Sequence, residues 1–162
     1  MFRDVSYPNE VVSMDFIGPI PMGSVKGYIL VMVDHLTRKV ALLHTNDASQ
    51  HTVLRGIRRW ESENGKPEIC FTDGGPGFKG NNVHYYCAQK GIRVMTSLPY
   101  LHRSNGVTER VNRTILMKLR KTDYPDTEWA NLLPFVETCY NETPHSIIGE
   151  ALVDVWNGDT EL

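Results

Sequence analysis

Residues Tyr28–Val33, in the segment KGYILVMVDH, form a nearly continuous apolar run that is rich in β-branched side chains. This composition is typical of a strand that is buried on both faces, so helices must cover both sides of its sheet. Strand patterns lie close by on either side: Val11–Ile17, which we expect to end at the turn-forming GPIPMG, and Lys39–Thr45. Three strands so close together in sequence predict an antiparallel meander.

Helices and strands alternate in the next part of the chain. Ser49 can cap a helix that Gly65 ends, and Val53, Ile57 and Trp60 recur within it at helical spacing. The segments that follow are expected to be a strand, a helix closed by a glycine and a last strand: PEICFTD (67–73), NNVHYYCAQKG (81–91) and IRVMTS (92–97). Such alternation is typical of parallel strands joined by crossovers. The expected fold class is α/β, with a mixed sheet of about five strands, three antiparallel and then parallel additions, flanked by helices.

The second half of the chain is mostly helical. From Gly106 a helical pattern runs to about Lys121, and at about 100° per residue its apolar sector contains Val111, Ile115 and Leu119. The opposite side carries an acid among basic residues: Glu109, Arg110, Arg113, Met117, Arg120 and Lys121. A further helix over residues 127–142 is expected to be capped by Asp126 and kinked by Pro134, with a short helix in the tail.

Composition limits the class of protein. A length of 162 residues fits one domain, spanning 1–162, and 41% apolar with 22% charged residues excludes a disordered or fibrous chain. The apolar runs are shorter than a membrane span and the polar N-terminus lacks the apolar centre of a signal peptide, so we expect an intracellular protein that is not secreted. Cys70, Cys87 and Cys139 have no paired spacing and are expected to be reduced. Because the net charge is −2, any binding of nucleic acid must depend on local basic clusters.

Three acidic residues stand where folding does not require an acid: Asp15 within the first strand, Asp73 at the end of the fourth, and Glu109 on the helix from Gly106. If the first and fourth strands are neighbours, a helix packed beside them can bring all three carboxylates together. Two unit charges about 4 Å apart repel by roughly 4 kcal/mol at an effective dielectric of 20. Mg²⁺, which prefers oxygen ligands, removes this cost, and two such ions can support phosphoryl transfer.

Each acid alone also has a structural interpretation. The segment TDGGPGF around Asp73 has the composition of a tight turn. Asp15 could be a solvated residue of an edge strand, and Glu109 could pair with Arg113 four positions on. Only the spacing and context of the three acids taken together favour a metal site. Other conspicuous residues are expected to be structural: Asp34 in a turn, and Trp60, Trp129 and Trp156 in the core or an interface.

Five motifs in order resemble one family: MDFIGPIP, GYILVMVDHLTRKV, GKPEICFTDGGPGF, SNGVTERVNRTI and YNETPHSIIGE. They look like the integrase catalytic core of retroviruses and LTR retrotransposons, of the gypsy type, over about residues 11–158. The 35 residues between Asp73 and Glu109 match the spacing of the family's Asp, Asp, 35, Glu motif. The resemblance implies an RNase H-like fold in which Asp15, Asp73 and Glu109 are the catalytic triad and bind Mg²⁺ or Mn²⁺, two ions per active site.

The resemblance also implies an activity and partners. The enzyme would be a DDE-type integrase, a polynucleotidyl transferase that processes 3′ ends of DNA and joins them to target DNA. Its partner would be double-stranded DNA, from element ends and target, in the nucleus after passage through the cytoplasm, and the core would self-associate at least as a dimer. The zinc-binding module before such a core and the basic module after it are not expected within residues 1–162.

DNA contacts are expected along the helix from Gly106 and the loop before it. Asn112 matches a family asparagine and Arg113 a residue that contacts the DNA end, whereas Leu116 departs from a common lysine that neighbouring basic residues could replace. The full set assigned to DNA is Tyr100, Ser104, Asn105, Gly106, Arg110, Asn112, Arg113, Arg120 and Lys121. Two other functions stay open: a domesticated integrase-derived domain that binds DNA or protein without catalysis, and an RNase H-like nuclease that cuts without joining.

Overall fold

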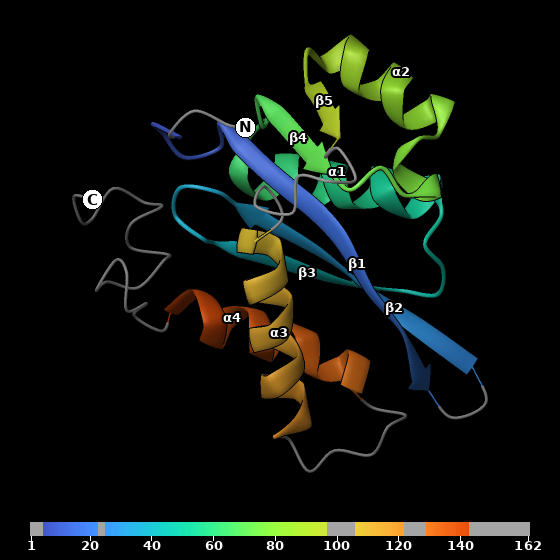
Figure 1. The fold of residues 1–162 in the computed structure, drawn as a ribbon, viewed down its shortest axis with the longest axis vertical. Coiled ribbons are helices and arrows are strands. Elements are labelled where there is room, and N and C mark those ends of the chain that lie inside the picture. The colour runs from blue at the N-terminus through green and yellow to red at the C-terminus, as the bar shows by residue number, and fades with distance from the viewer. Residues whose placement is uncertain (1–4, 23–24, 97–105, 122–128, 143–162) are drawn as a thin grey trace.

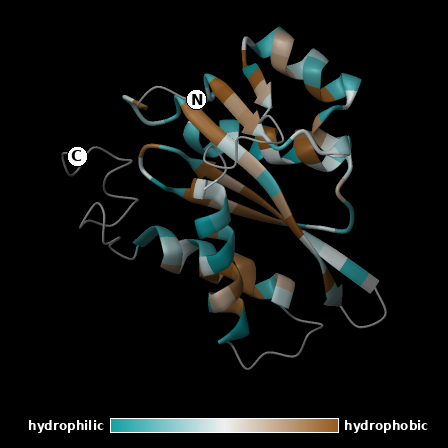
Figure 2. Ribbon diagram, in the orientation of Figure 1, coloured by the Kyte–Doolittle hydropathy of each residue, from teal (hydrophilic) through white to brown (hydrophobic). Residues whose placement is uncertain are grey.

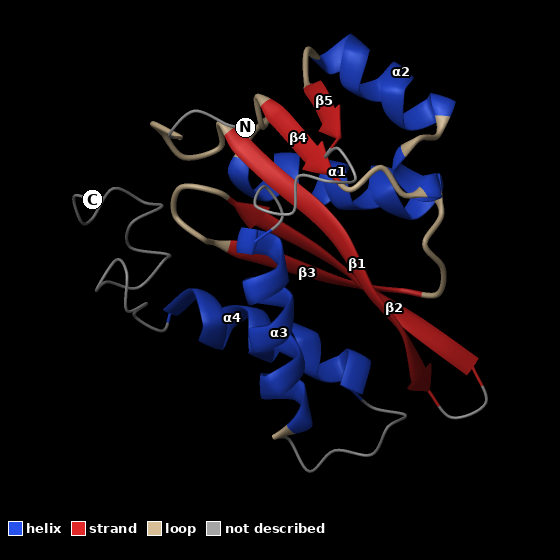
Figure 3. Cartoon of the chain, viewed as in Figure 1, coloured by secondary structure: helices blue, strands red, loops and turns tan. Residues whose placement is uncertain are grey.

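The computed structural model describes residues 5–22, 25–96, 106–121 and 129–142. Its centre is a five-stranded sheet in the order β3-β2-β1-β4-β5 (Figures 1 and 3). The strands are β1 (Val11–Met22), β2 (Val25–Asp34), β3 (Val40–Thr45), β4 (Ile69–Thr72) and β5 (Arg93–Thr96). β1, β2 and β3 pair antiparallel, and β4 and β5 add in parallel beside β1. The predicted α/β class, meander and parallel additions are confirmed.

Strand β2 is buried on both faces, as its apolar run predicts. Leu30 and Met32 point into the core on one side of the sheet, and Ile29, Val31 and Val33 point into a separate core on the other. All five side chains are at most 1% exposed. Figure 2 shows the apolar residues concentrated along these central strands.

Helices α1 (Gln50–Asn64) and α2 (Asn81–Lys90) cover one face of the sheet. Ser49 caps α1, because its hydroxyl accepts a hydrogen bond from the Thr52 N–H. Gly91 ends α2 at a φ of 72°, in the left-handed region that glycine adopts without strain. A short 3-10 turn, η1 (Pro76–Phe78), joins β4 to α2.

Helices α3 (Gly106–Arg120) and α4 (Leu133–Glu142) cover the other face. Val111 and Ile115 of α3 are buried, whereas the side chains of the predicted charged face, from Glu109 to Lys121, are exposed. The apolar sector of this helix is therefore the one that the sequence predicts. Among the described residues, no helix is long and apolar enough to cross a membrane.

Strand β1 is longer than predicted. It continues through the GPIPMG segment to Met22, with a break in register between Ile17 and Ile20. Beyond Met14, β1 pairs with β2 alone, because β4 ends at Thr72. On the side without a neighbouring strand, the backbone N–H groups of β1 need no partner there. Proline, which has no N–H, is therefore tolerated in this part of the strand, where the sequence indicated a turn.

The single kinked helix predicted over 127–142 is also different in the structure. A 3-10 turn, η3 (Trp129–Leu132), precedes α4, so Pro134 lies in the first turn of a new helix. Proline is tolerated there, because the first-turn N–H groups have no partner within the helix. Asp126 and the tail helix lie outside the described residues.

Asp34, Trp60 and Trp129 have the structural roles that the sequence predicts. The buried Asp34 carboxylate accepts hydrogen bonds of 2.7–2.8 Å from the N–H groups of Asn9 and Thr37 and from the Thr37 hydroxyl. Trp60 is fully buried and donates its indole N–H to Asn9. Trp129 is buried and donates to the Pro21 carbonyl, whereas Trp156 lies outside the described residues. The cysteines are free, as predicted.

Side chains from two helices cover the edge strand β3. The Asn141 carboxamide accepts from the Val40 N–H at 2.9 Å and donates to the Val40 carbonyl at 3.0 Å, as a neighbouring strand would. Glu137 accepts from the Leu42 N–H, and Arg59 donates to the Leu42 carbonyl while pairing with Glu137. Uncovered edges invite pairing with other chains, so this arrangement closes one edge of the sheet.

We expect Asn141→Ala to lower the free energy of unfolding by roughly 2–4 kcal/mol, because it leaves the buried N–H and carbonyl of Val40 unpaired. Urea denaturation measures this change. The exposed Thr138 on the same helix provides the control, since Thr138→Ala should change stability by less than about 0.5 kcal/mol. An equally small effect of both substitutions would show that the amide does not protect the edge.

Candidate active site

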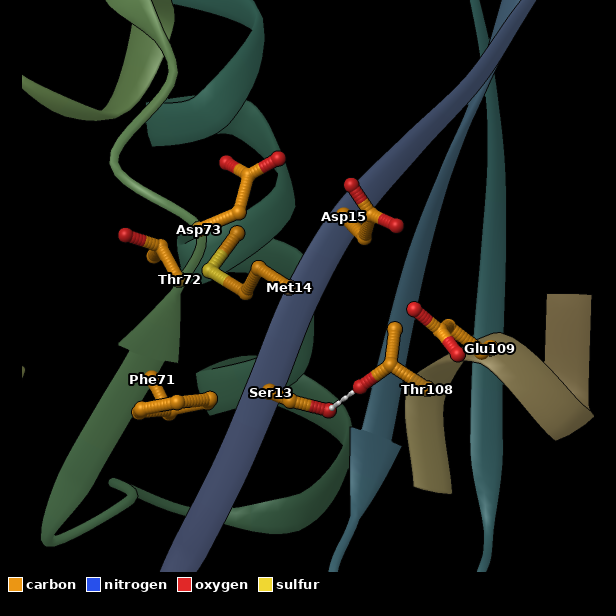
Figure 4. Close-up of a pocket in the computed structure, with 8 residues that line it drawn as sticks. All are labelled: Ser13, Met14, Asp15, Phe71, Thr72, Asp73, Thr108 and Glu109. Atoms are coloured by element: carbon orange, nitrogen blue, oxygen red, sulfur yellow. Dashed lines mark hydrogen bonds between the residues drawn. The ribbon is translucent and has the colours of Figure 1, made fainter. Parts of the chain in front are cut away.

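One pocket lies where β1, the end of β4 and the start of α3 meet (Figure 4). The three acids singled out in the sequence, Asp15, Asp73 and Glu109, all line it. The other lining residues are Ser13, Met14, Phe71, Thr72 and Thr108. Residues far apart in the chain thus contribute to a single site from two strands and a helix.

The sheet brings Asp15 and Asp73 together. β1 and β4 are parallel neighbours whose last paired positions are Met14 and Thr72, so Asp15 and Asp73 follow as the next positions of the same register. Side chains at matched positions of parallel strands project to the same face. At Asp15 β1 pairs with β2 alone, but the side chain is half-buried and accepts a hydrogen bond from Asn112, which argues against a merely solvated residue of an edge strand.

Two side-chain hydrogen bonds seat α3 against β1. The Thr108 hydroxyl donates to the Ser13 hydroxyl at 2.9 Å, and the Asn112 amide donates to Asp15 Oδ2 at 2.9 Å. The spacings match, because two strand residues advance about 6.6 Å and four helix residues about 6 Å. Glu109 follows Thr108 directly, so this register fixes where its backbone stands beside the pocket.

The segment TDGGPGF combines a turn with a site residue. Asp73 Oδ1 accepts from the Gly75 N–H at 2.9 Å, and Gly74 has a φ of 78°, which favours glycine. The Asp73 side chain is exposed at the mouth of the pocket. The turn interpretation and the site interpretation of Asp73 are therefore compatible.

The three carboxylates interact electrostatically. The pKa of Asp15 is raised to about 6, chiefly by burial and next by the charge of Asp73, with a smaller contribution from Glu109. Hydrogen bonds from Asn112 and from the Phe16 N–H oppose this rise. In Figure 4 Asp15 is drawn between the other two acids. Ionised Asp15 thus destabilises the folded protein, and a nearby cation would reduce this destabilisation.

The donor set of the pocket fits Mg²⁺ or Mn²⁺, because its charged groups are carboxylates, other oxygens come from hydroxyl side chains, and no cysteine or histidine lines it. The acids do not form a closed cluster: among the described residues, no group of three His, Cys, Asp or Glu side chains lies close enough to hold a metal ion. The three acids share the lining of one pocket, and their convergence on a metal ion stays a prediction. Two of the acids, Asp73 and Glu109, are exposed, so their side chains have room to change rotamer.

The residues assigned to DNA divide into three groups. Arg110, Arg113, Arg120 and Lys121 are exposed along α3 or at its end. Asn112 is half-buried and donates a hydrogen bond to Asp15, one of the acids that line the pocket. Gly106 begins α3 and accepts from Arg110 Nε through its carbonyl, whereas Tyr100, Ser104 and Asn105 lie outside the described residues.

The alternative that Glu109 serves only to pair with Arg113 receives no support. No ion pair joins the two side chains in the part of the chain that the structure describes. Sequence reasoning missed Ser13 and Thr108, which line the pocket and bond to each other. Their signal is positional: each is a small hydroxyl residue on a buried face, two residues before Asp15 and one before Glu109.

Comparison with known proteins agrees with this geometry. The integrase core domain family matches residues 6–102. The Pro-Pol polyprotein of simian foamy virus type 1 is 29% identical over 144 residues, which cover 83% of this chain and 12% of the polyprotein. The chain therefore spans only a small part of the curated relatives that it matches.

Solved structures show the same fold. The HTLV-2 integrase catalytic core domain in complex with magnesium, in its dimeric form, has a TM-score of 0.77 and 21% identity, covering 92% of this chain and 96% of that one. A chain of the simian T-cell lymphotropic virus intasome in complex with PP2A regulatory subunit B56 gamma has a TM-score of 0.82 and 20% identity, covering 96% and 57%. The fold is RNase H-like, and with the family match over residues 6–102 the chain belongs to the integrase core domain family of retroviral type.

Proposed function

We propose that the chain is the catalytic core of a divalent-metal-dependent polynucleotidyl transferase that processes DNA 3′ ends and joins them to target DNA. The observation that carries this proposal is that Asp15 in β1, Asp73 just after β4 and Glu109 in α3 line one pocket. Burial, together with the charges of Asp73 and Glu109, raises the pKa of Asp15. Acids arranged in this way are costly for a stable fold but suited to binding cations.

The three acids of the pocket and two groups that contact them have roles in this proposal. Asp15, Asp73 and Glu109 would hold the metal, which when bound would activate an attacking oxygen and stabilise a leaving oxygen at phosphorus. Asn112 orients Asp15 through its hydrogen bond to Oδ2, and the Gly75 N–H orients Asp73 through Oδ1. With the Phe16 N–H, which donates to Asp15 Oδ1, these hydrogen bonds hold both oxygens of Asp15 and one oxygen of Asp73, which restricts the directions in which each carboxylate can turn.

The relatives support the cofactor and partner assignments. The HTLV-2 core was solved with magnesium and in a dimeric form, and the simian T-cell lymphotropic virus protein forms an intasome. By likeness, this chain would use Mg²⁺ or Mn²⁺, self-associate and act on double-stranded DNA in the nucleus. The exposed Arg113 and Arg120 lie on the same side of α3 as Glu109, where a DNA backbone entering the pocket would pass.

A joining assay tests the proposed activity. Labelled blunt-ended DNA duplexes of varied end sequence are incubated with a plasmid and Mg²⁺ or Mn²⁺, and the products are resolved by size. We expect joined product from the native chain and a loss of at least about 100-fold in Asp73→Asn, because the variant loses a ligand charge but keeps the side-chain shape. Glu142→Gln, an exposed change on α4, is the control and should keep the activity.

The products also distinguish the competing functions. Cut DNA without joined DNA would indicate a nuclease, and neither product would indicate a binding module without catalysis. Either result from the native chain would contradict the proposed function. Equal joining by the native chain and Asp73→Asn would exclude the assigned triad.

We expect Asp15→Asn to have opposite effects on stability and metal binding. A rise in pKa from 3.8 to about 6 corresponds to an unfavourable free energy of up to about 3 kcal/mol at neutral pH, so removing this charge should stabilise the metal-free protein by about 1–3 kcal/mol. Within the described residues, Asn112 Oδ1 is buried without a hydrogen-bond partner, and a turn of its amide would let it accept from the new side chain.

Thermal unfolding with and without 10 mM or so of Mg²⁺ measures both effects. The native chain should gain stability with Mg²⁺, whereas Asp15→Asn should start from a higher Tm and gain little. A Tm of the metal-free variant below that of the metal-free native chain would show that the charge of Asp15 does not destabilise the folded protein.

We expect Arg113→Gln to weaken DNA binding by a similar factor for all sequences and to reduce the slope of log affinity against log salt by about 1, because one phosphate contact is lost. Fluorescence anisotropy at several salt concentrations measures this slope. Arg93→Gln, at an exposed position on β5, is the matched control and should leave the slope unchanged. Equal slopes for the native chain, Arg113→Gln and Arg93→Gln would show that Arg113 does not contact DNA phosphates.

A further inference from the structure

We propose that Ser13 and Thr108 are a positioning pair: their buried hydrogen bond sets the place of Glu109 beside the pocket and thereby the affinity for the divalent cation. This inference rests on the proposed function. It concerns two uncharged residues outside the acidic triad, which would act on the site by holding a metal ligand in place.

The contact between the two hydroxyls has an ordinary hydrogen-bond length and is shielded from water. Thr108 Oγ1 donates to Ser13 Oγ at 2.9 Å, and the two residues are only 4% and 1% exposed. Both line the same pocket as the acids, and Figure 4 shows their bond bridging β1 and the first turn of α3. The pair is therefore a direct link between the strand of Asp15 and the helix of Glu109.

A hydrogen bond at this position does something that apolar packing cannot. Apart from the hydrogen bond from Asn112 to Asp15, α3 contacts the sheet through Val111, Ile115 and other apolar side chains, which tolerate small sliding movements. A buried hydroxyl pair is directional and loses its partner when the helix shifts, so it selects one register. Stability alone does not require it, because two apolar groups of similar size could fill the same space.

The position of Thr108 makes this register important for Glu109. The two residues are neighbours in the first turns of α3, and a shift of one residue would move Glu109 by about 1.5 Å along the helix axis and about 100° around it. Such a rotation would turn Glu109 away from Asp15 and Asp73. The second link, from Asn112 to Asp15, lies three residues beyond Glu109, whereas Thr108 is the direct neighbour of Glu109 and so holds its backbone most closely.

Titration with Mn²⁺, followed by calorimetry or by the electron paramagnetic resonance of free Mn²⁺, tests the inference without measuring catalysis. We expect Thr108→Val, which keeps the shape but removes the donor, to weaken Mn²⁺ binding by about 10-fold or more, as for other groups that orient metal ligands. Thr108→Ser retains the hydroxyl and should restore affinity to within about 3-fold of the native chain. Thr114→Val is the matched control, because the Thr114 hydroxyl donates to the Arg110 carbonyl of its own helix and Thr114 is not among the described residues that line the pocket.

A double-mutant cycle tests whether the two hydroxyls act through each other. Ser13→Ala and Thr108→Val should each weaken Mn²⁺ binding, and the double variant should be no weaker than the worse single variant. Urea denaturation of every variant separates this effect from general destabilisation. The Mn²⁺ affinity of Thr108→Val tests the proposal if this variant remains folded at the temperature of the titration. If it does not, the recovery of affinity in Thr108→Ser tests it.

The outcomes separate this inference from the proposed function. If the native chain and Thr108→Val bind Mn²⁺ equally, the positioning role is wrong while the metal site stands. If Thr108→Ser binds as weakly as Thr108→Val, the effect comes from packing and the inference is also wrong. If the native chain binds no Mn²⁺, both the inference and the proposed function fail.

Discussion

The seating of α3 on β1 is the constraint on which the site depends. The sheet alone places Asp15 and Asp73 side by side, because β1 and β4 are parallel and in register. The third acid, however, comes from a helix that packs mainly through apolar side chains. Two hydrogen bonds, from Thr108 to Ser13 and from Asn112 to Asp15, give that packing a defined register. Without a defined register, Glu109 would have no fixed relation to the strands.

The rest of the fold supports a pocket that is itself unfavourable. Burial and neighbouring charge raise the pKa of Asp15, so the pocket destabilises the folded chain when it holds no cation. Two apolar cores, one on each face of β2, and polar contacts far from the pocket offset this destabilisation. Asn141 and Glu137 cover the edge strand β3, and Asp34 ties the N-terminal segment to the turn after β2. Stability and site chemistry are thus assigned to different parts of the molecule.

Much of this could be predicted from the sequence, for identifiable physical reasons. The apolar run at Tyr28–Val33 predicts a strand that is buried on both faces, and the spacing of Val111 and Ile115 predicts the buried side of α3. The positions of the acids gave the pocket. The extension of β1 through Pro19 and Pro21 was missed, because local turn chemistry does not reveal that β1 lacks a partner on one side. The Ser13 and Thr108 contact was missed because hydroxyl residues carry little sequence signal until their elements are packed.

The central claim is that the three carboxylates of this pocket bind a divalent cation. Crystals soaked in Mn²⁺, with anomalous diffraction recorded near the manganese edge, test it most directly. We expect an anomalous peak at about 2.0–2.3 Å from oxygens of Asp15 and Asp73, with Glu109 turned toward the same ion or a second one. A map without a peak in this pocket, or with manganese bound only elsewhere on the chain, would contradict the claim.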